Sequence, residues 1–284
     1  MSRKEELLYK GQGRYGEFTV TRRGEVVTLW SPSDVRQTAL DLTQPHVPVL
    51  EYARNLAAAF LFHPGMSRVL VMGLGGGALP AMFLSGTATT SRSDGAAIDA
   101  GGRTPISVDV VELDPLVLEL AGKYFGFSES PRLKVFIDDA NRFIDSSDKN
   151  YDLIIVDTFL GAAQPSWVST KKFLTRAAGR LTGEGLIALN LMTSKTFRYG
   201  KSIDTIGEVY KNLWSLAAKT SNNTVVFAMQ RTRSRFEMVL NSGKLDRGFS
   251  ETFKVDALMD RIECLPGENP HDLRSQRTMK IKHE

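Results

Sequence analysis

Residues 69–77, VLVMGLGGG, decide the fold of this 284-residue chain. The four apolar residues predict a buried parallel strand, the glycines predict a tight turn, and residues 78–84 predict the start of a helix. Glycines allow the backbone to turn sharply and to pass close to a ligand. A strand, a glycine turn and a helix in this order cradle the sugar or phosphate of a nucleotide. A glycine run alone is equally consistent with a plain turn, so the rest of the chain has to decide.

Three further apolar runs carry an acid at their carboxyl ends. The runs ISVDVVEL, LKVFIDD and YDLIIVD contain Glu112, Asp139 and Asp157. Parallel strands end at one edge of their sheet, and ligands bind at that edge in open α/β folds. At the end of the second strand, an acid accepts hydrogen bonds from both ribose hydroxyls, so this role is predicted for Glu112. With no lysine of the phosphate-loop type, the pattern favours a nucleoside over a triphosphate.

Residues 85–105 separate the glycine turn from Glu112 by more than the usual distance of about twenty residues. They are rich in serine, threonine, glycine and alanine and have no apolar period. This composition predicts a mobile surface insertion, which explains the long separation.

Several ordered motifs resemble the spermidine synthase family and its methyltransferase-like relatives, which share the class I S-adenosylmethionine fold. The resemblance covers residues 13–193. Its motifs are GLGGGALP, VVELDP, KYFGF, PRLKV, DDA and YDLIIVDTF, preceded by QTALDL and LEYARNLAAAFLF. It implies an α/β, Rossmann-like class I methyltransferase fold, with a mostly parallel seven-stranded sheet, helices on both faces and a small N-terminal β-hairpin region.

The resemblance also implies a site for S-adenosylmethionine or its decarboxylated form. The glycines are expected near the methionine and ribose, Glu112 at the ribose hydroxyls, and Asp139 together with Ala140 at the adenine. Asp157 is expected at the reacting centre, as a catalytic base or orienting group, or as the group that holds the methionine amine. Gln37 matches a glutamine that touches the nucleoside, although a surface position is as consistent. The implied cofactor-binding residues are Gln37, Gly73, Gly75, Gly77, Glu112, Asp139, Ala140 and Asp157.

Two departures from the family bear on the reaction. Aminopropyltransferases carry an aspartate at the position of Gly76, which holds the amine of the decarboxylated donor, and a second at the position of Leu160, which deprotonates the polyamine. A protonated amine is a poor nucleophile until a base removes its proton. A cationic substrate also needs negative charge along its channel. The loss of both acids therefore favours intact S-adenosylmethionine and methyl transfer.

Three functions follow from these residues. The favoured one is methyl transfer to an amine or carboxylate of a small molecule. A peptide is the other acceptor that these residues allow. The alternative is a polyamine aminopropyltransferase whose base comes from elsewhere in the chain. The third is a nucleoside-binding protein without catalysis. Trp167, in the loop after Asp157, is expected either to wall the acceptor pocket or to anchor the loop in the core.

The chain is expected to divide into an N-terminal β-hairpin region (1–45), a Rossmann-like domain (46–245) and a polar, basic tail (246–284). A hairpin is predicted at 16–30, and helices at 45–62, 170–181 (ended by Gly183) and 203–220. Strands are predicted at 186–191, 224–229 and 236–240, the last two as a closing antiparallel hairpin. The tail from 270 is expected to be disordered.

Composition narrows the remaining choices. The net charge is +4 and the pI about 9.1, but the basic residues are scattered, which favours a solvated surface over nucleic-acid binding. The single cysteine, Cys264, excludes an internal disulfide, and the histidines show no metal-ligand spacing, so no metal is expected. There is no apolar run of about eighteen residues and no signal core. A cytoplasmic protein without membrane contact is expected, and the family suggests a homodimer.

Overall fold

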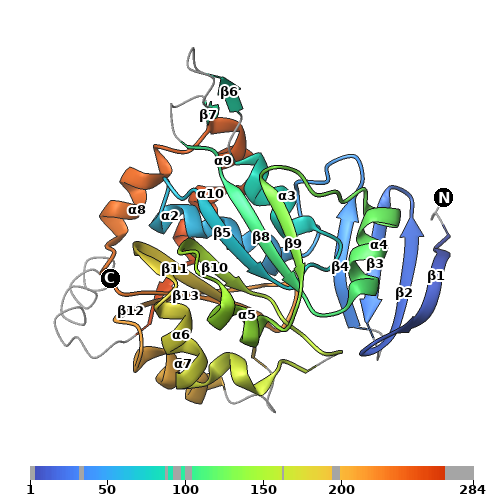
Figure 1. Ribbon diagram of the computed structural model, residues 1–284. Coiled ribbons are helices and arrows are strands. Elements are labelled where there is room, and N and C mark those ends of the chain that lie inside the picture. The colour runs from blue at the N-terminus through green and yellow to red at the C-terminus, as the bar shows by residue number, and fades with distance from the viewer. Residues whose placement is uncertain are drawn as a thin grey trace, which may run out of the picture.

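The structure is a computed structural model that describes residues 4–31, 35–86, 89–91, 97–99, 104–161, 163–193 and 199–265. A large mixed sheet with helices on both faces forms the main body, and a four-stranded antiparallel sheet lies beside it (Figure 1). The predicted α/β class I methyltransferase fold is confirmed.

The large sheet has eight strands rather than the expected seven, because two residues after the last helix add a short edge strand. The five neighbouring strands from β11 to β9 are parallel, and the pairings of β11 with β13, β13 with β12 and β12 with β14 are antiparallel. In sheet order they are β14 (Glu263–Cys264), β12 (Asn212–Ala217), β13 (Asn223–Met229), β11 (Leu181–Met192), β10 (Tyr151–Val156), β5 (Arg68–Met72), β8 (Ser107–Glu112) and β9 (Leu133–Ile137).

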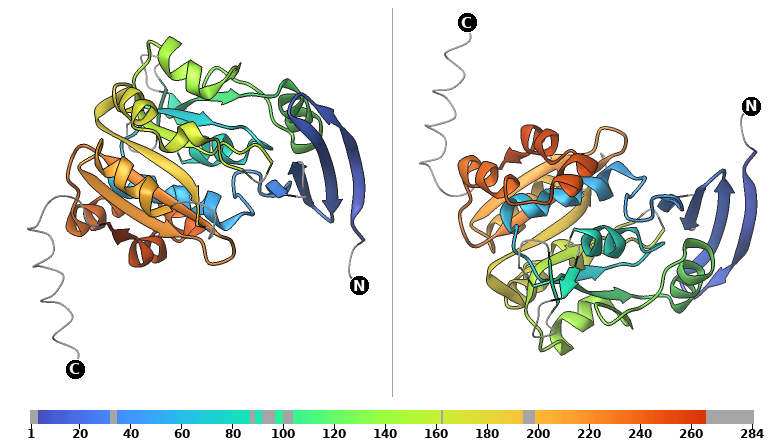
Figure 2. Two further views of the ribbon diagram at one scale, coloured as in Figure 1. Left: turned by 90° about the horizontal axis from the view of Figure 1, so that it is seen from below. Right: turned by 90° about the horizontal axis from the view of Figure 1, so that it is seen from above.

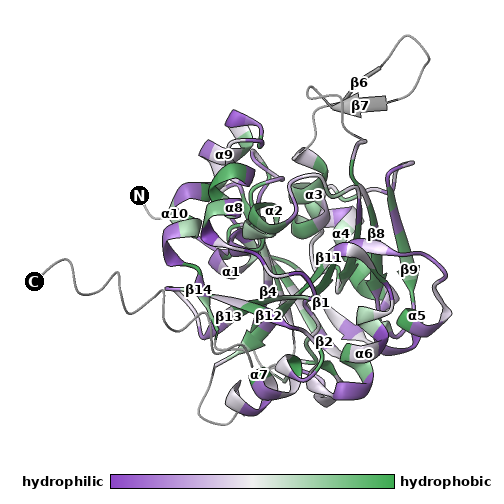
Figure 3. Ribbon diagram, turned by 90° about the vertical axis from the view of Figure 1, so that its left-hand side faces the viewer, coloured by the Kyte–Doolittle hydropathy of each residue, from purple (hydrophilic) through white to green (hydrophobic). Residues whose placement is uncertain are grey.

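The central strand β10 shows how the core is divided. All of its residues are buried, and successive side chains point to opposite faces. Leu153 and Ile155 belong to an apolar cluster on one face, called the first cluster below, while Ile154 and Val156 belong to the second cluster on the opposite face. In Figure 3, hydrophobic residues accordingly concentrate on the strands and on the inner sides of the helices.

Helices cover both faces of the large sheet (Figure 2). Those that pack into the first cluster are α1 (Glu51–Asn55), the 3-10 turn η2 (Leu56–Ala58), α2 (Ala59–Phe62), α3 (Ala78–Ser85), α4 (Pro115–Phe125), α8 (Arg235–Ser242), α9 (Arg247–Phe253) and α10 (Val255–Arg261). Those on the opposite face are α5 (Ala140–Ser146), the 3-10 turn η3 (Ser166–Ser169), α6 (Lys171–Ala178) and α7 (Tyr199–Gly207).

The N-terminal sheet contains the predicted hairpin, in which Val20 pairs with Leu29. Two more strands extend it, so that its order is β1 (Glu6–Gly13), β2 (Gly16–Arg23), β3 (Val26–Ser31) and β4 (Val35–Asp41). Alternate residues of β2 and β3 are buried in the first cluster. The strand β4 contacts α3, and this contact brings the small sheet to the glycine turn.

The expected topology after residue 203 was wrong in two places. The helix predicted at 203–220 ends with α7, and the following residues form β12, in which Trp214 pairs with Phe227 of β13. The strand predicted at 236–240 lies inside α8, where a capping box between Ser234 and Glu237 starts the helix. Such a box satisfies the free N–H groups of the first turn, and here it outweighs the β-like apolar run FEMVL.

Two helix boundaries also differ from the predictions. The helical segment expected from residue 45 begins only at Glu51, after a stretch that contains two prolines, Pro45 and Pro48. The helix expected over 170–181 ends at Ala178, with Gly179 as its C-cap, and Gly183 belongs to β11 instead.

Part of the expected polar tail is folded. Phe249 and Phe253 on α9, and Val255 and Leu258 on α10, are buried in the first cluster. The three-part division of the chain remains a prediction. Within the expected insertion, β6 (Thr89–Ser91) pairs with β7 (Ala97–Asp99). Its other residues from 87 to 103, and the tail from 266 onward, lie outside the described part of the chain.

None of the helices in the described ranges combines the length and the apolar character that crossing a membrane requires.

Candidate functional site

A cavity of about 280 Å³ lies at the carboxyl ends of β5, β8 and β10, with β4 and α1 completing its wall. Gly77 does not line it but caps α3 at its N-terminus, with a φ of 82°. The structure brings all the other predicted site residues together along this cavity: Gln37, Gly73, Gly75, Glu112, Asp139, Ala140 and Asp157.

The glycine turn is tightly enclosed by two neighbouring segments. Gly73 has a φ of +102°, and a Cβ there would lie 2.3 Å from the carbonyl oxygen of Asp157. Gly75 has a φ of +55°, and its Cβ would lie 2.1 Å from Oγ1 of Thr38. That hydroxyl accepts a hydrogen bond from the Gly76 N–H at 3.1 Å. Both glycines are therefore required by the backbone and by the close approach of β4 and the β10 end.

Gly76, where aminopropyltransferases carry an aspartate, does not line the cavity. A Cβ at this position would lie 2.6 Å from the ring of Phe125, on α4. An acidic side chain at position 76 would consequently require the end of α4 to move.

Glu112 is fixed at the turn by three backbone donors. Its Oε2 accepts from the Leu74 N–H at 2.9 Å, and its Oε1 accepts from the N–H groups of Leu113 and Asp114 at 2.7 and 2.9 Å. Burial raises the pKa of Glu112, and these hydrogen bonds oppose the shift. The carboxylate thus joins the glycine turn to the end of β8, facing the cavity.

Asp139 and Ala140 form the start of α5. Oδ1 of Asp139 accepts from the N–H groups of Asn141 and Arg142 at 2.7 and 3.3 Å, so this carboxylate is the N-cap of the helix. Ala140 is buried at the first helical position. Both residues line the same cavity as Glu112.

Asp157 is the titratable group best suited to chemistry. Its Oδ1 accepts from the Asn190 amide at 2.8 Å, and its Oδ2 accepts from the Tyr52 hydroxyl at 3.3 Å. Burial raises the pKa of Asp157 to about 6, although both hydrogen bonds lower it. A carboxylate with a pKa near neutrality is a competent general base.

Sequence reasoning missed Tyr52, Asn190 and Asn223, which line the cavity around Asp157. Asn190 is fully buried in β11, and its Oδ1 accepts from the Asn223 amide at 3.0 Å. Gln164 donates to the Asn190 carbonyl oxygen at 2.7 Å. One signal was present, because Asn190 is the single polar residue in the apolar run LIALNL.

The outer part of the cavity is apolar. Leu160, where aminopropyltransferases carry their second aspartate, lines it and is 47% exposed. Trp167 serves both expected purposes, because it lines the cavity and packs edge-on against Phe173 with ring centroids 4.7 Å apart. Thr158 also lines the cavity, and its buried Oγ1 has no hydrogen-bond partner in the described structure.

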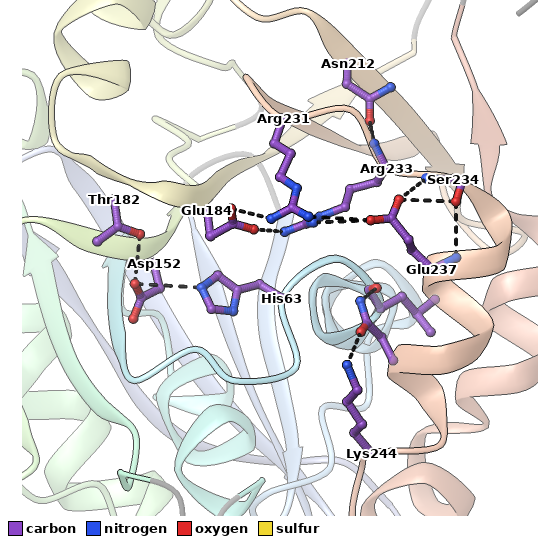
Figure 4. Close-up of polar contacts among 12 residues, drawn as sticks. His63, Asp152, Thr182, Glu184, Asn212, Arg231, Arg233, Ser234, Glu237 and Lys244 are labelled. Carbon is purple, nitrogen blue, oxygen red and sulfur yellow. Dashed lines mark hydrogen bonds and ion pairs between the residues drawn. The ribbon is translucent and has the colours of Figure 1, made fainter.

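A second polar cluster lies at the amino ends of the central strands, opposite the cavity (Figure 4). Asp152, in β10, accepts from the N–H groups of Ser67 and Arg68 at 2.9 and 3.0 Å and from the Thr182 hydroxyl at 2.9 Å. Nε2 of His63 lies 3.8 Å from this carboxylate. Burial alone would raise the pKa of Asp152, but the hydrogen bonds lower it below its ordinary value. This cluster stabilises the fold and contributes nothing to the cavity lining.

No group of three or more histidine, cysteine, aspartate or glutamate side chains within the described ranges is arranged to hold a metal ion.

The model of the spermine/spermidine synthase domain matches residues 55–228, which include β5, β8, β10 and β11.

The relatives include both kinds of transferase. A polyamine aminopropyltransferase of Vibrio vulnificus is 28% identical over 186 residues, covering 63% of this chain and 55% of its own. The human eEF1A lysine and N-terminal methyltransferase is 34% identical over 220 residues, covering 69% of this chain and 29% of its own. The chain thus spans about half or less of the length of these relatives.

Two solved structures share the fold. A probable spermidine synthase from Corynebacterium glutamicum has a TM-score of 0.66 at 21% identity, with 83% of this chain and 86% of that one covered. Human Methyltransferase-like protein 13 in complex with SAH has a TM-score of 0.51 at 23% identity, with 78% and 92% covered.

Proposed function

Since the chain belongs to the spermine/spermidine synthase domain family, we propose that it is an S-adenosylmethionine-dependent methyltransferase that acts on an amine. The observation that carries the proposal is the cavity around Asp157. It holds one carboxylate with a pKa of about 6, and a leucine where aminopropyltransferases carry a second acid.

The cavity fits an adenosyl ligand on its own geometry. The backbone of the glycine turn lines the cavity at Gly73 and Gly75, and Glu112 lines it beside them, at a position suited to two ribose hydroxyls. When bound, S-adenosylmethionine supplies an electrophilic methyl group on a sulfonium.

Asp157 has the chemistry that an amine acceptor needs. At neutral pH its carboxylate is ionised, so it can hold the acceptor ammonium and accept a proton, which frees the lone pair for in-line attack. Tyr52 and Asn190 hold the two oxygens of the carboxylate and thereby orient it. Positioning of the two reactants accounts for most of the acceleration expected in such a displacement.

The apolar outer wall favours an amine carried by a peptide or another partly apolar molecule. Leu160 and Trp167 offer no negative charge to the second ammonium of a polyamine. The methyltransferase relatives are named for lysine and N-terminal methylation, and an acceptor of this class fits the same wall.

Aminopropyl transfer is the second candidate, since the Vibrio relative carries that name. It requires Asp157 to act without a partner acid, or a base from another segment. A nucleoside-binding protein without catalysis is the third candidate.

The direct test is transfer of a labelled methyl group from S-adenosylmethionine to peptides with a free N-terminus, to the same peptides N-acetylated, and to lysine-containing peptides. Decarboxylated donor with putrescine forms the parallel assay. We expect methylated product and no spermidine, and loss of product in Asp157→Asn but not in Asp148→Asn, an exposed aspartate before β10. Spermidine formation that Asp157→Asn abolishes would establish the second candidate instead.

Cytoplasmic residence, a homodimer and the absence of nucleic-acid binding remain predictions. Light scattering on the purified chain tests the dimer.

A further inference from the structure

Arg36 is the one cationic side chain among the described residues that line the cavity. It lies on β4, is exposed, and forms no hydrogen bond or ion pair with the rest of the described chain. A guanidinium in a ligand cavity is thus free to bind an anion. No part of the adenosine chemistry described so far requires it.

The neighbours of Arg36 place it toward the reacting end of the cavity. Two residues further along β4, Thr38 touches the glycine turn, and two residues of strand span about 6–7 Å. The adjacent Gln37 carbonyl oxygen accepts from the Tyr52 hydroxyl at 3.5 Å, and Tyr52 also donates to Asp157. β4 therefore runs past the turn toward Tyr52.

The ionisation of Tyr52 agrees with this placement. Burial and the Asp157 carboxylate raise the pKa of Tyr52, and the positive charge of Arg36 opposes the shift. Arg36 is consequently within electrostatic reach of the tyrosine that holds Asp157.

The charges along the cavity are unevenly distributed. Four carboxylates, Glu112, Asp114, Asp138 and Asp139, occupy the end formed by β8 and β9, whereas the reacting end carries the carboxylate of Asp157, the guanidinium of Arg36 and the neutral Leu160. Intact S-adenosylmethionine differs from its decarboxylated form by one α-carboxylate. A cation beside Tyr52 complements that carboxylate and repels a donor tail that carries only an ammonium.

We propose that Arg36 binds the α-carboxylate of the intact donor and thereby selects S-adenosylmethionine over its decarboxylated form. The inference rests on the proposed function, from which it takes the donor. Arginine suits the role because its planar guanidinium can donate two parallel hydrogen bonds to a carboxylate. As the side chain is exposed, a moderate contribution is expected.

Isothermal titration tests the assignment without knowledge of the acceptor. The ligands are S-adenosylmethionine, its decarboxylated form and 5′-methylthioadenosine, which lacks the amino-acid tail. The proteins are the wild type, Arg36→Gln, Arg36→Lys and, as a matched control, Arg247→Gln on α9, where Arg247 pairs with Glu251 on the surface.

We expect Arg36→Gln to weaken S-adenosylmethionine binding about 10-fold, in line with one charge-assisted contact. Binding of 5′-methylthioadenosine should stay unchanged, and binding of the decarboxylated donor should stay unchanged or tighten. Arg36→Lys should lose less affinity for S-adenosylmethionine than Arg36→Gln does, and Arg247→Gln should bind it as tightly as the wild type.

Equal weakening of all three ligands by Arg36→Gln, or no weakening of any, would overturn the assignment while leaving the proposed function intact. A wild type that prefers the decarboxylated donor would overturn the proposed function as well. Thermal melts of each variant show whether a loss of binding comes from unfolding.

Discussion

The strand β10 has one aspartate near its start, Asp152, and another directly after its end, Asp157, and the pKa values of the two carboxylates are shifted in opposite directions. At the amino end, Asp152 accepts hydrogen bonds from two backbone N–H groups and a hydroxyl, and its pKa is lowered. At the carboxyl end, Asp157 accepts only from Asn190 and Tyr52, and burial raises its pKa to about 6.

The difference separates an end of the sheet that is fixed by backbone donors from the end that we propose binds the ligand. Backbone donors from the start of β5 surround Asp152, so its charge stabilises the fold. Around Asp157 the donors are side chains, and they leave part of the carboxylate facing the cavity. A carboxylate that is ionised at a cost to the stability of the fold, and that a ligand can reach, is typical of a functional site.

The largest expected effect is on catalysis. In the proposed mechanism Asp157 is the base and holds the acceptor ammonium, so the transfer rate of Asp157→Asn should be about 10²–10⁴-fold lower than that of the wild type. Steady-state rates with a peptide acceptor measure it, with Asp148→Asn as the control. An Asp157→Asn enzyme with an unchanged rate would remove Asp157 from the mechanism.

The same substitution should stabilise the fold above pH 6. The folded-state pKa of Asp157, about 6, is above its ordinary value of 3.8, so ionising the carboxylate costs the folded state about 3 kcal/mol. The cost is absent below pH 4, grows between pH 4 and 6, and is complete above that.

Urea unfolding of wild type and Asp157→Asn at several pH values measures this cost. The free energy of unfolding of the variant should increase relative to that of the wild type as the pH rises from 4 to 7. A difference that does not vary with pH would show that Asp157 has an ordinary pKa.

At the other end of β10, Asp152→Ala should lower the free energy of unfolding by about 2 kcal/mol, because the Ser67 and Arg68 N–H groups lose their acceptor. The lowered pKa of Asp152 means that its contribution is present above pH 4 and is lost as the pH falls further. Chemical denaturation at pH 7 and pH 3 tests both statements. Affinity for S-adenosylmethionine should not change, and a loss of affinity in the folded variant would contradict the separation of the two ends.

The smallest effect is expected at Thr158, next to Asp157. Because its buried hydroxyl has no partner in the described structure, Thr158→Val should change the stability by less than about 1 kcal/mol. Thr170→Val is the contrast, since the Thr170 hydroxyl caps α6 and its loss should cost about 1 kcal/mol. Thermal melts with and without S-adenosylmethionine distinguish the cases, and weaker binding by Thr158→Val alone would identify the hydroxyl as a ligand contact.

The sequence predicted the parts of the site that are coded locally. Strand, glycine turn and strand-end acid each occupy one short segment, so the positions of Gly73, Glu112 and Asp157 along the sheet edge followed from periodicity and topology. Gly77 lies outside the cavity lining, since the ring of Phe127 packs against it, and its expected contact with the cofactor stays a prediction.

The residues that were missed come from distant segments. Tyr52 reaches Asp157 from α1, which no local pattern could reveal. The strand β12 was taken for the end of a helix because its run NLWSLA has no alternation, as both of its faces are buried in the sheet. The helix α8 was taken for a strand, although the spacing of Ser234 and Glu237 in the sequence is that of a capping box.

The contact between Thr38 and the glycine turn has an evolutionary consequence. The hydroxyl occupies the space that a side chain at position 75 would need, and it accepts the N–H of Gly76. A larger residue at position 38 would force the turn apart, and a residue other than glycine at position 75 would force β4 away. Among descendants of this sequence, these positions should therefore mutate in concert, and grafting β4 from a distant homologue should succeed only when its own turn is transplanted with it.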